Sequence, residues 1–278
     1  MKNLLFLSCF LMLLGNSCLA QSKPERIVSM SLCSDELILA LAQPEHILSI
    51  SYLSADTAFS ANSDEIPAGV SLNRGRAEEI IALEPDLILS SQFSATNAVN
   101  LLQSLDYSVN VLGFPSDLDA SYRQIREVAA LLHEPERGEQ LIASMQANLQ
   151  DIQSALRSLQ GQSAIFYSNN GFSFGRGTLR DHFLSSLQLR NLASEQGLNN
   201  VGKFPLELLI QSRPDFLLVD AATAQDDQLA SPLLKHPVIN QFFSAEQVIV
   251  LPDRLFQCAG PSFLQAYSHM LNALGFEP

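Results

Sequence analysis

The amino-acid sequence predicts an α/β protein, with two α/β lobes that have mostly parallel sheets and are joined by one long interlobe helix. Three observations support this fold class. Apolar runs typical of buried strands alternate with amphipathic helical stretches in both halves of the chain. A long helical stretch separates the two halves. A helix-to-strand phrase with the same pattern of Glu, Pro and Asp occurs once in each half.

The first 20 residues have the layout of a secretory signal peptide. A short basic start, Met1–Asn3, precedes the almost wholly apolar run Leu4–Gly15, and a small residue, Ala20, closes the segment. The run is too short to span a bilayer, so we expect cleavage near Ala20 and export of the mature chain to the periplasm. A lipid anchor at Cys18 is the alternative, although the residues before it fit a lipobox poorly.

The first half, residues 21–134, contains four apolar runs of β type bounded by turn residues. These predicted strands are Arg26–Ser31, His46–Ser51, Asp86–Ser91 and Ser108–Gly113. The helical stretches between them are Asp35–Leu41, Arg76–Leu83 and Thr96–Leu105. Because this alternation builds parallel sheets, we expect the first half to form an N-terminal α/β lobe.

The middle of the chain carries two apolar stripes at helical spacing, separated by Pro135, which ends the first helix. The first stripe consists of Ile125, Val128, Ala129 and Leu132. The second stripe consists of Leu141, Met145, Leu149, Ile152, Leu156 and Leu159. A helix from Glu136 to Leu159 would be roughly 36 Å long, which is enough to cross from one lobe to the other. We assign residues 135–160 to this interlobe helix.

The alternation of strands and helices resumes in residues 161–278, which we expect to form a C-terminal α/β lobe. Its predicted strands are Ser163–Ser168, Asp215–Asp220 and Gln247–Pro252. A helix is expected to begin at Thr178, since Thr178 and Asp181 form a variant of the capping box. Leu179 and Phe183 begin its apolar face.

The chain is strongly acidic. Its 16 Lys and Arg residues fall to 15 when Lys2 is removed with the leader, and 29 Asp and Glu residues remain, so the mature net charge is −14. Such a surface repels phosphate backbones and anionic membranes. We therefore do not expect nucleic acid as a partner.

The shared phrase reads EEIIALEPDLIL in the first half, from Glu78, and ELLIQSRPDFLL in the second half, from Glu207. In both halves the glutamate lies seven residues before a Pro-Asp pair, on a short amphipathic helix that leads into a buried strand. A helix-to-strand turn explains Pro85 and Pro214. It does not explain why a glutamate occupies the same place in both helices, where any polar residue would serve.

Several phrases together resemble the periplasmic substrate-binding proteins of ABC importers for cobalamin and ferric siderophores, the class with a single rigid interlobe helix. The phrases are RIVSMSLCSDELILAL, RAEEIIALEPDLIL, FPLELLIQSRPDFLLV and GRGTLRDHFLSSLQLRNLA, and they cover essentially the whole mature chain. The resemblance implies a monomer that binds a small-molecule chelate, a corrinoid or a siderophore-like iron complex, in a cleft between the lobes, without catalysis or cofactor. It also implies that Glu78 and Glu207 lie on the outer tips, where the family docks onto arginines of the membrane permease.

Large planar or macrocyclic cargo requires aromatic faces and a few oriented polar groups. Loops that follow the strands of an open α/β sheet form its ligand crevice. The candidate ligand-binding residues in such loops are Tyr52, Asn73, Arg74, Phe93, Phe114, Phe172, Phe174, Arg254 and Phe256. Arginines on both sides suit an anionic ligand, although Arg74 and Arg76 could instead pair with the glutamates that follow them. The chain has no Trp, which the cobalamin-binding members often place in these loops, so the identity of the chelate is left open.

Cys33 and Cys258 remain in the mature chain, one after the first predicted strand and one after the last. In an exported protein they allow one internal disulfide. A disulfide requires Cα atoms within about 7 Å, and opposite walls of a cleft for large cargo are normally further apart. We therefore expect two free thiols that face the cleft, with buried thiols and a disulfide as the alternatives.

Two other classes of function are weighed against a chelate-binding protein. Residues 171–175 fit the G-x-S-x-G pattern of a hydrolase nucleophile elbow at Ser173, with Asp220 and His269 following in order. An elbow serine lies directly before its helix, whereas here two residues separate the motif from Thr178, so we expect no catalytic residues. The five histidines are scattered, so we expect no metal site. A secreted serine hydrolase, or a protein that binds a bare metal ion or haem, is the alternative function.

Overall fold

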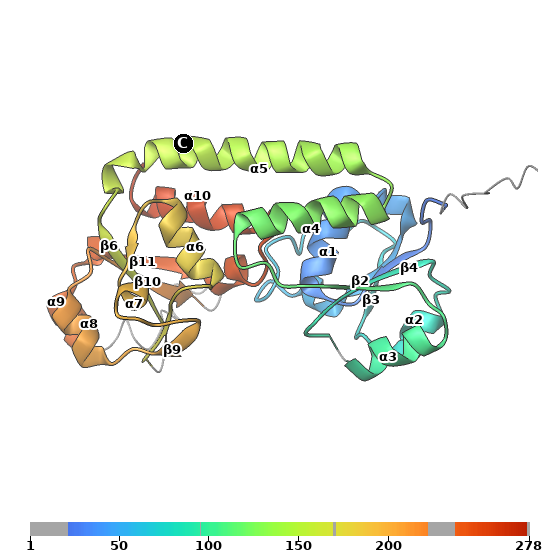
Figure 1. Ribbon diagram of the computed structural model, residues 1–278, viewed down its shortest axis with the longest axis horizontal. Coiled ribbons are helices and arrows are strands. Elements are labelled where there is room, and N and C mark those ends of the chain that lie inside the picture. The colour runs from blue at the N-terminus through green and yellow to red at the C-terminus, as the bar shows by residue number, and fades with distance from the viewer. Residues whose placement is uncertain (1–21, 95, 169–170, 222–236, 277–278) are drawn as a thin grey trace, which may run out of the picture.

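The computed structural model describes residues 22–276, except residues 95, 169–170 and 222–236. The predicted signal peptide therefore lies outside the described residues. Figure 1 shows two α/β units side by side, with helix α5 (Pro135–Ala155) running along one side of both. We call the unit before α5 the first lobe and the unit after it the second lobe. No helix in the described part of the chain is both long and apolar enough to cross a membrane.

The first lobe is built on a five-stranded sheet in which all neighbouring strands are parallel. From one edge to the other, its strands are β3 (Ser71–Asn73), β2 (Ile47–Ser51), β1 (Ile27–Ser29), β4 (Leu87–Ser91) and β5 (Val109–Leu112). The four strands that the sequence predicts are confirmed. The sequence does not predict β3, because this edge strand has only three residues and two of them are exposed.

The helices of the first lobe are α1 (Leu32–Leu41), α2 (Ala77–Ile81), α3 (Thr96–Ser104) and α4 (Leu118–Leu131). Two of them begin where a side chain accepts a backbone N–H: Ser31 caps α1, and Asp117 caps α4. Because Ser31 is the cap, α1 begins three residues before its predicted start. Two 3₁₀ turns, η1 (Pro44–His46) and η2 (Tyr52–Ala55), precede and follow β2.

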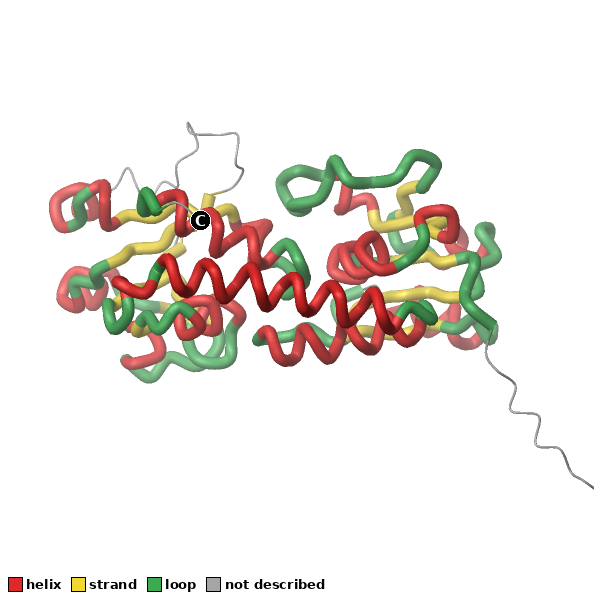
Figure 2. The backbone as a smooth tube through the Cα atoms, turned by 90° about the horizontal axis from the view of Figure 1, so that it is seen from above, coloured by secondary structure: helices red, strands yellow, loops and turns green. Residues whose placement is uncertain are grey.

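Helix α5 is the long helix between the lobes, with Pro135 in its first turn. Its 21 residues span roughly 32 Å, a little less than predicted, because the helix ends at Ala155. The 3₁₀ turn η3 (Arg157–Leu159) follows it. The packing of α5 on α4 is close, since a Cβ atom at Gly138 would lie 2.6 Å from the Cβ atom of Ala129. Glycine at position 138 therefore allows the two helices to pack side by side, as Figure 2 shows.

The second lobe contains a six-stranded mixed sheet. Along its main path the strands are β11 (Val248–Pro252), β10 (Phe216–Ala221), β6 (Ser163–Ser168), β7 (Phe172–Phe174) and β9 (Val201–Lys203), and β8 (Arg190–Asn191) also pairs with β6. The three predicted strands, β6, β10 and β11, are parallel to one another, whereas β7 is antiparallel to both of its neighbours. The sequence does not predict β7, β8 and β9, because two or three residues are too few for an alternating pattern.

The helices of the second lobe are α6 (Leu179–Ser186), α7 (Leu192–Glu195), α8 (Leu206–Ser212), α9 (Pro237–Phe242) and α10 (Phe263–Ala273). Two 3₁₀ turns, η5 (Ala245–Gln247) and η6 (Asp253–Phe256), flank β11. The predicted start of α6 is confirmed, since the Thr178 hydroxyl accepts the backbone N–H of Asp181 at 3.1 Å.

The repeated Pro-Asp pair has the same structural role in both lobes. The residue before each proline, Glu84 or Arg213, has a left-handed backbone, with φ of 45° and 43°. The Asp86 carboxylate accepts two backbone N–H groups before β1, at 2.8 and 3.0 Å. The Asp215 carboxylate accepts the backbone N–H and the hydroxyl of Ser163 at the start of β6, both at 2.7 Å. Each aspartate thus ties its helix-to-strand turn to the beginning of a neighbouring strand.

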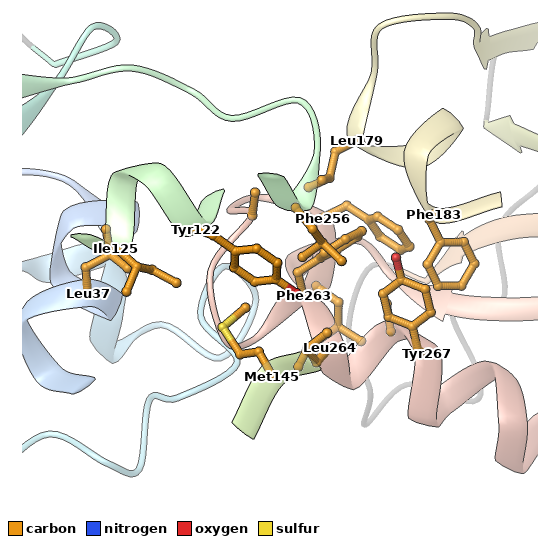
Figure 3. Packing of buried hydrophobic residues seen from close by; sticks show 14 of the residues in the cluster. Leu37, Tyr122, Ile125, Met145, Leu179, Phe183, Phe256, Phe263, Leu264 and Tyr267 are labelled. Atoms are coloured by element: carbon orange, nitrogen blue, oxygen red, sulfur yellow. The ribbon is translucent and has the colours of Figure 1, made fainter. Parts of the chain in front are cut away.

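One hydrophobic core runs through both lobes and α5. In Figure 3, Leu37 and Ile125 come from the first lobe, Met145 comes from α5, and Phe256 and Tyr267 come from the second lobe. The lobes are therefore packed directly on each other near α5 and are not only tethered by it.

Candidate ligand-binding site between the lobes

A pocket lies between the two lobes. Its first-lobe wall is formed by α1 and by residues 54–62 after β2, and its second-lobe wall by η6 and the segment that leads into α10. The lining includes Leu32 and Glu36 from the first lobe and Arg254 and Cys258 from the second. Both walls follow the carboxyl ends of parallel strands, which is where open α/β sheets bind ligands.

Tyr52 and Arg74 together form one exposed surface of the first lobe. Tyr52 follows β2 and is 42% exposed, and the guanidinium carbon of Arg74 lies 4.8 Å from the centre of its ring. This cation–π contact presents a flat, positively charged face. The backbone N–H of Arg74 donates to Glu79 at 2.8 Å, and the Arg76 side chain lies 4.0 Å from the same carboxylate. Glu79 therefore fixes the backbone of the loop that carries Arg74 and Arg76, while the Arg74 side chain lies over Tyr52.

Asn73 is a predicted ligand contact, but its side chain is buried. It is 3% exposed and forms its hydrogen bonds within the protein. Its amide donates to the Ser29 carbonyl at 2.8 Å and to the Ser49 hydroxyl at 2.9 Å, and its side-chain oxygen accepts the N–H of Gly75 at 3.0 Å. Gly75 has φ of +69°, a conformation that glycine adopts without strain. Asn73 thus shapes the turn that carries Arg74.

Phe93 and Phe114 follow the neighbouring strands β4 and β5 and form an exposed aromatic pair. They are 76% and 39% exposed, and their rings meet edge to face with centroids 6.0 Å apart. Contiguous exposed apolar surface of this kind is typical of a region that receives a ligand or a partner.

The second lobe exposes one of its three candidate aromatic side chains. Phe172, on β7, is 37% exposed, and the Lys203 ammonium lies 4.1 Å from the centre of its ring. Phe174 is half-buried. The prediction that Phe256 faces the ligand is wrong. Its side chain is 5% exposed and packs edge to face on Phe166, with ring centroids 5.2 Å apart. The turn η6 directs this side chain into the core that the two lobes share. The sequence pattern could not show this direction.

Arg180, on α6, is a residue of this region that sequence reasoning missed. Its side chain is 10% exposed, and Nη2 donates to Asp220, at 3.0 Å, and to Asp253. Its guanidinium carbon lies 4.0 Å from the ring centre of Phe174 and 4.8 Å from that of Phe256. Two carboxylates and two aromatic faces therefore compensate the buried cation.

Asp220 and Asp253 lie at the carboxyl ends of the neighbouring strands β10 and β11. Burial raises the pKa of Asp220, and the positive charge of Arg180 opposes this rise. One pattern in the sequence fits such a contact, because an acid ends or directly follows each of two predicted strands and two neighbouring carboxylates favour a cation between them. Nothing in the sequence shows which of the arginines supplies it.

Cys33 and Cys258 form a disulfide, with Cα atoms 5.3 Å apart. The expectation of two free thiols that face the cleft is therefore wrong. That expectation assumed that the two lobes stay apart along the whole length of the cleft. In the structure, the shared core holds the beginning of α1 against residues 257–262. The bond links the lobes at the pocket, where Cys258 is 4% exposed.

Two buried carboxyl groups lie on α1 beside the disulfide. Asp35 accepts the backbone N–H of Ser51 and, at 2.7 Å, the hydroxyl of Ser54. Burial raises the pKa of Asp35 to about 7, and these hydrogen bonds oppose only part of the rise. Glu36 contacts the other lobe, since its Oε1 accepts the backbone N–H of Ser262 at 2.5 Å, and burial also raises its pKa.

The side chains that fit a hydrolase pattern in the sequence do not form a catalytic arrangement. Ser173 is 0% exposed, and its hydroxyl donates to the Phe166 carbonyl at 2.6 Å. The Asp220 carboxylate pairs with Arg180 and not with a histidine. In the part of the chain that the structure describes, no group of three His, Cys, Asp or Glu side chains is placed to hold a metal ion.

Glu78 and Glu207 occupy equivalent places in the two lobes. Each is the second residue of its helix, α2 or α8, and each is exposed. Figure 1 shows these helices near opposite ends of the molecule, on the side away from α5. The two carboxylates are thus free to meet a partner surface that spans both lobes.

Known proteins resemble this chain in sequence and in fold. A family model described as "Periplasmic binding protein" matches residues 27–255. An uncharacterized ABC transporter substrate-binding lipoprotein of Bacillus subtilis, YvrC, is 20% identical over 185 residues. That match covers 63% of this chain and 58% of the relative, so the chain matches little more than half the relative's length.

Solved structures share the fold. A possible iron-binding periplasmic protein of Staphylococcus epidermidis has a TM-score of 0.75 at 17% identity, over 91% of this chain and 100% of that chain. The haem-binding protein RhuT of Roseiflexus has a TM-score of 0.70 at 24% identity, over 90% and 97%. The vitamin B12 binding protein BtuF of Vibrio cholerae has a TM-score of 0.65 at 17% identity, over 91% and 97%. At these identities the likeness shows the fold.

Proposed function

The chain belongs to the family of periplasmic binding proteins, and from this premise we propose that it is the solute-binding component of an ABC importer. It is exported to the periplasm and acts there as a monomer. It captures a metal chelate, a corrinoid or a siderophore-like iron complex, between its lobes and delivers it to a membrane permease. The descriptions of YvrC and BtuF support this role. It performs no chemistry on the chelate.

The observation that carries this proposal is the set of side chains at the carboxyl ends of both sheets. The first lobe presents the Tyr52–Arg74 stack and the exposed pair of Phe93 and Phe114. Arg254 of the second lobe lines the pocket between the lobes. Aromatic faces suit a macrocycle or a catecholate, and arginines on both sides suit ligand carboxylates or phosphates. This chemistry favours an anionic chelate.

Haem is a second candidate ligand. Its porphyrin is planar and its propionates are anionic, so the same aromatic and arginine side chains fit it. Tyrosine is one of the side chains that hold haem iron in proteins, and Tyr52 is exposed beside Arg74. The description of RhuT as a haem-binding protein adds support.

Absorbance titrations with cyanocobalamin, dicyanocobinamide, haemin and ferric enterobactin test the proposal. For the ligand that binds, Arg74→Met and Arg254→Met should each raise the dissociation constant about tenfold or more, because each removes a charge-assisted hydrogen bond. Arg126→Met is the matched control, since Arg126 is half exposed, pairs with Glu139 and does not line the pocket. Equal affinity of all three variants and the wild type would refute the assignment of the site.

The permease is proposed to dock on Glu78 and Glu207, with arginines as their partners. Replacing both with Ala should abolish uptake in cells but leave ligand affinity and melting temperature unchanged, because exposed substitutions usually change stability by less than about 0.5 kcal/mol. The control is the double variant of Glu45 and Glu246, two exposed glutamates in η1 and η5. Unimpaired uptake by the first variant would remove the docking role.

A further inference from the structure

Tyr52 lies on a short turn that one side chain of helix α1 fixes on both sides of the tyrosine. The turn is η2, and it has only four residues, so its own hydrogen bonds hold it weakly. Oδ2 of Asp35 accepts the backbone N–H of Ser51, directly before the turn, at 3.1 Å. The same oxygen accepts the Ser54 hydroxyl, inside the turn, at 2.7 Å. Tyr52 therefore lies between two residues that are bonded to one carboxyl group.

The burial of these residues shows what the bonds achieve. Asp35 is 0% exposed, Ser51 4% and Ser54 2%, whereas Tyr52 is 42% exposed. Burying a carboxyl group costs free energy, and burial raises the pKa of Asp35. An apolar side chain would fill this place in α1 at a lower cost. The bonds to η2 are what the carboxyl group supplies and an apolar side chain could not.

The loop that carries Arg74 is attached to the same part of the first lobe. The Asn73 amide donates to the carbonyl of Ser29, the last residue of β1, at 2.8 Å. A hydrogen bond from the Ser29 side chain also lowers the pKa of Asp35, near the beginning of α1. The connection between β1 and α1 thus anchors both loops. The 4.8 Å contact between the Arg74 guanidinium and the Tyr52 ring depends on both anchors.

We infer that Asp35 is a positioning residue for the proposed ligand site, because it holds the Tyr52 ring against the Arg74 guanidinium. For the ligand, this inference rests on the proposed function. Without the carboxyl group, η2 loses both bonds, and the exposed Tyr52 ring is free to leave Arg74. A ligand that uses this flat, positively charged face would then have to order two side chains when it binds, which weakens binding.

Fluorine NMR of the protein labelled with 3-fluorotyrosine tests the inference without a ligand. The chain has five tyrosines, and the variant Tyr52→Phe identifies the Tyr52 signal by its loss. In Asp35→Leu this signal should move toward its position in Arg74→Met, where the cation–π contact is absent. In Asp35→Asn the signal should stay near its wild-type position, because the amide oxygen can still accept both bonds.

Leu209→Ala is the control for a general loss of stability, since Leu209 is buried in a cluster whose described members all come from the second lobe. It should lower the melting temperature but leave the Tyr52 signal in place. Ser54→Ala removes one of the two bonds and tests the same attachment if Asp35→Leu does not fold. An unmoved Tyr52 signal in Asp35→Leu, or in Ser54→Ala if only that variant folds, would overturn the inference.

A second arm measures affinity, with haemin and dicyanocobinamide as the probes. Asp35→Leu should bind whichever probe the wild type binds about tenfold more weakly, and Asp35→Asn and Leu209→Ala should bind it as the wild type does. In a Tyr52→Ala background, Asp35→Leu should have little further effect, because both residues act through one contact.

Two results of the affinity arm would refute the positioning role. One is a shifted Tyr52 signal with unchanged affinity, and the other is an equal effect of Asp35→Leu with and without Tyr52. If the wild type binds neither probe, the proposed function fails for these ligands. The fluorine signal still decides in that case whether Asp35 holds Tyr52 against Arg74.

Discussion

Replacement of Arg180 by Met tests whether this buried cation holds the second-lobe wall together. The substitution keeps most of the apolar side chain but removes the charge that Asp220 and Asp253 share. Two carboxylates then lie close together at the ends of β10 and β11 without a cation between them. The contacts of the guanidinium with the Phe174 and Phe256 rings are lost as well.

The size of the effect follows from the burial of the three partners. Breaking a fully buried ion pair from one side costs about 3–5 kcal/mol, because a buried charge is left without compensation. Here the arginine side chain is 10% exposed, but the side chains of Asp220 and Asp253 are 23% and 42% exposed, so water solvates part of the orphaned charge. We therefore expect Arg180→Met to lower the free energy of unfolding by about 2–4 kcal/mol.

Urea denaturation of the wild type and the variant measures this loss. Arg126→Met is the matched control, since it breaks an ion pair with Glu139 whose side chains are 50% and 58% exposed. Exposed pairs contribute about 0–1 kcal/mol, so the control should remain near the wild type. Adding Asp220→Asn and Asp253→Asn to Arg180→Met should recover part of the loss. Equal losses for the two arginine variants, or no recovery, would refute the reasoning.

Three further predictions concern Asp35, the contact between Gly260 and Glu36, and the serine of the hydrolase-like motif. The raised pKa of Asp35, about 7 in the folded protein, means that the folded state keeps a proton that the unfolded chain releases above about pH 4. Stability conferred by this proton is present at low pH and is lost as the pH rises to 7. In urea titrations the wild type should therefore lose more stability than Asp35→Asn between pH 4.5 and pH 7.5. Equal losses in the two proteins would contradict this. Gly260→Ala should lower the melting temperature, because its Cβ would lie too close to the Glu36 carboxylate, whereas Gly113→Ala, with open space around it, should not. A Gly260→Ala variant as stable as Gly113→Ala would show that Glu36 moves aside without cost. Ser173→Ala should cost about 1 kcal/mol of stability through its lost hydrogen bond to a strand, and an ester-hydrolysis activity that disappears in this variant would restore the hydrolase hypothesis.

The sequence predicts the framework of both sheets because buried parallel strands are continuous apolar runs. The runs at Ile27–Ser29 and Phe216–Ala221 illustrate this, since both lie in the interior of their sheets. The start of α6 is predictable for a local reason, the reciprocal position of Thr178 and Asp181. Strands as short as β7 and β9 form only because neighbours are in place, and a local pattern cannot show them.

The site is less predictable, because its residues are brought together by tertiary packing. Tyr52 and Phe93 are exposed as the loop positions suggest. Phe256 has the same type of position in the sequence, but the core that joins the lobes buries it. The same packing brings Cys33 and Cys258 within bonding distance. Both errors arise from treating the lobes as separate bodies with an open space between them.

A thermal-unfolding screen of the mature protein against cobalamin, cobinamide, haemin and ferric siderophores tests the central claim most directly. A ligand that binds only the folded protein raises the free energy of unfolding by about 2.7 kcal/mol when its concentration is a hundredfold above its dissociation constant. We predict that at least one of these chelates raises the melting temperature in a concentration-dependent way and that bare iron and cobalt salts do not. Stabilisation by a bare metal ion and by none of the chelates would contradict the account.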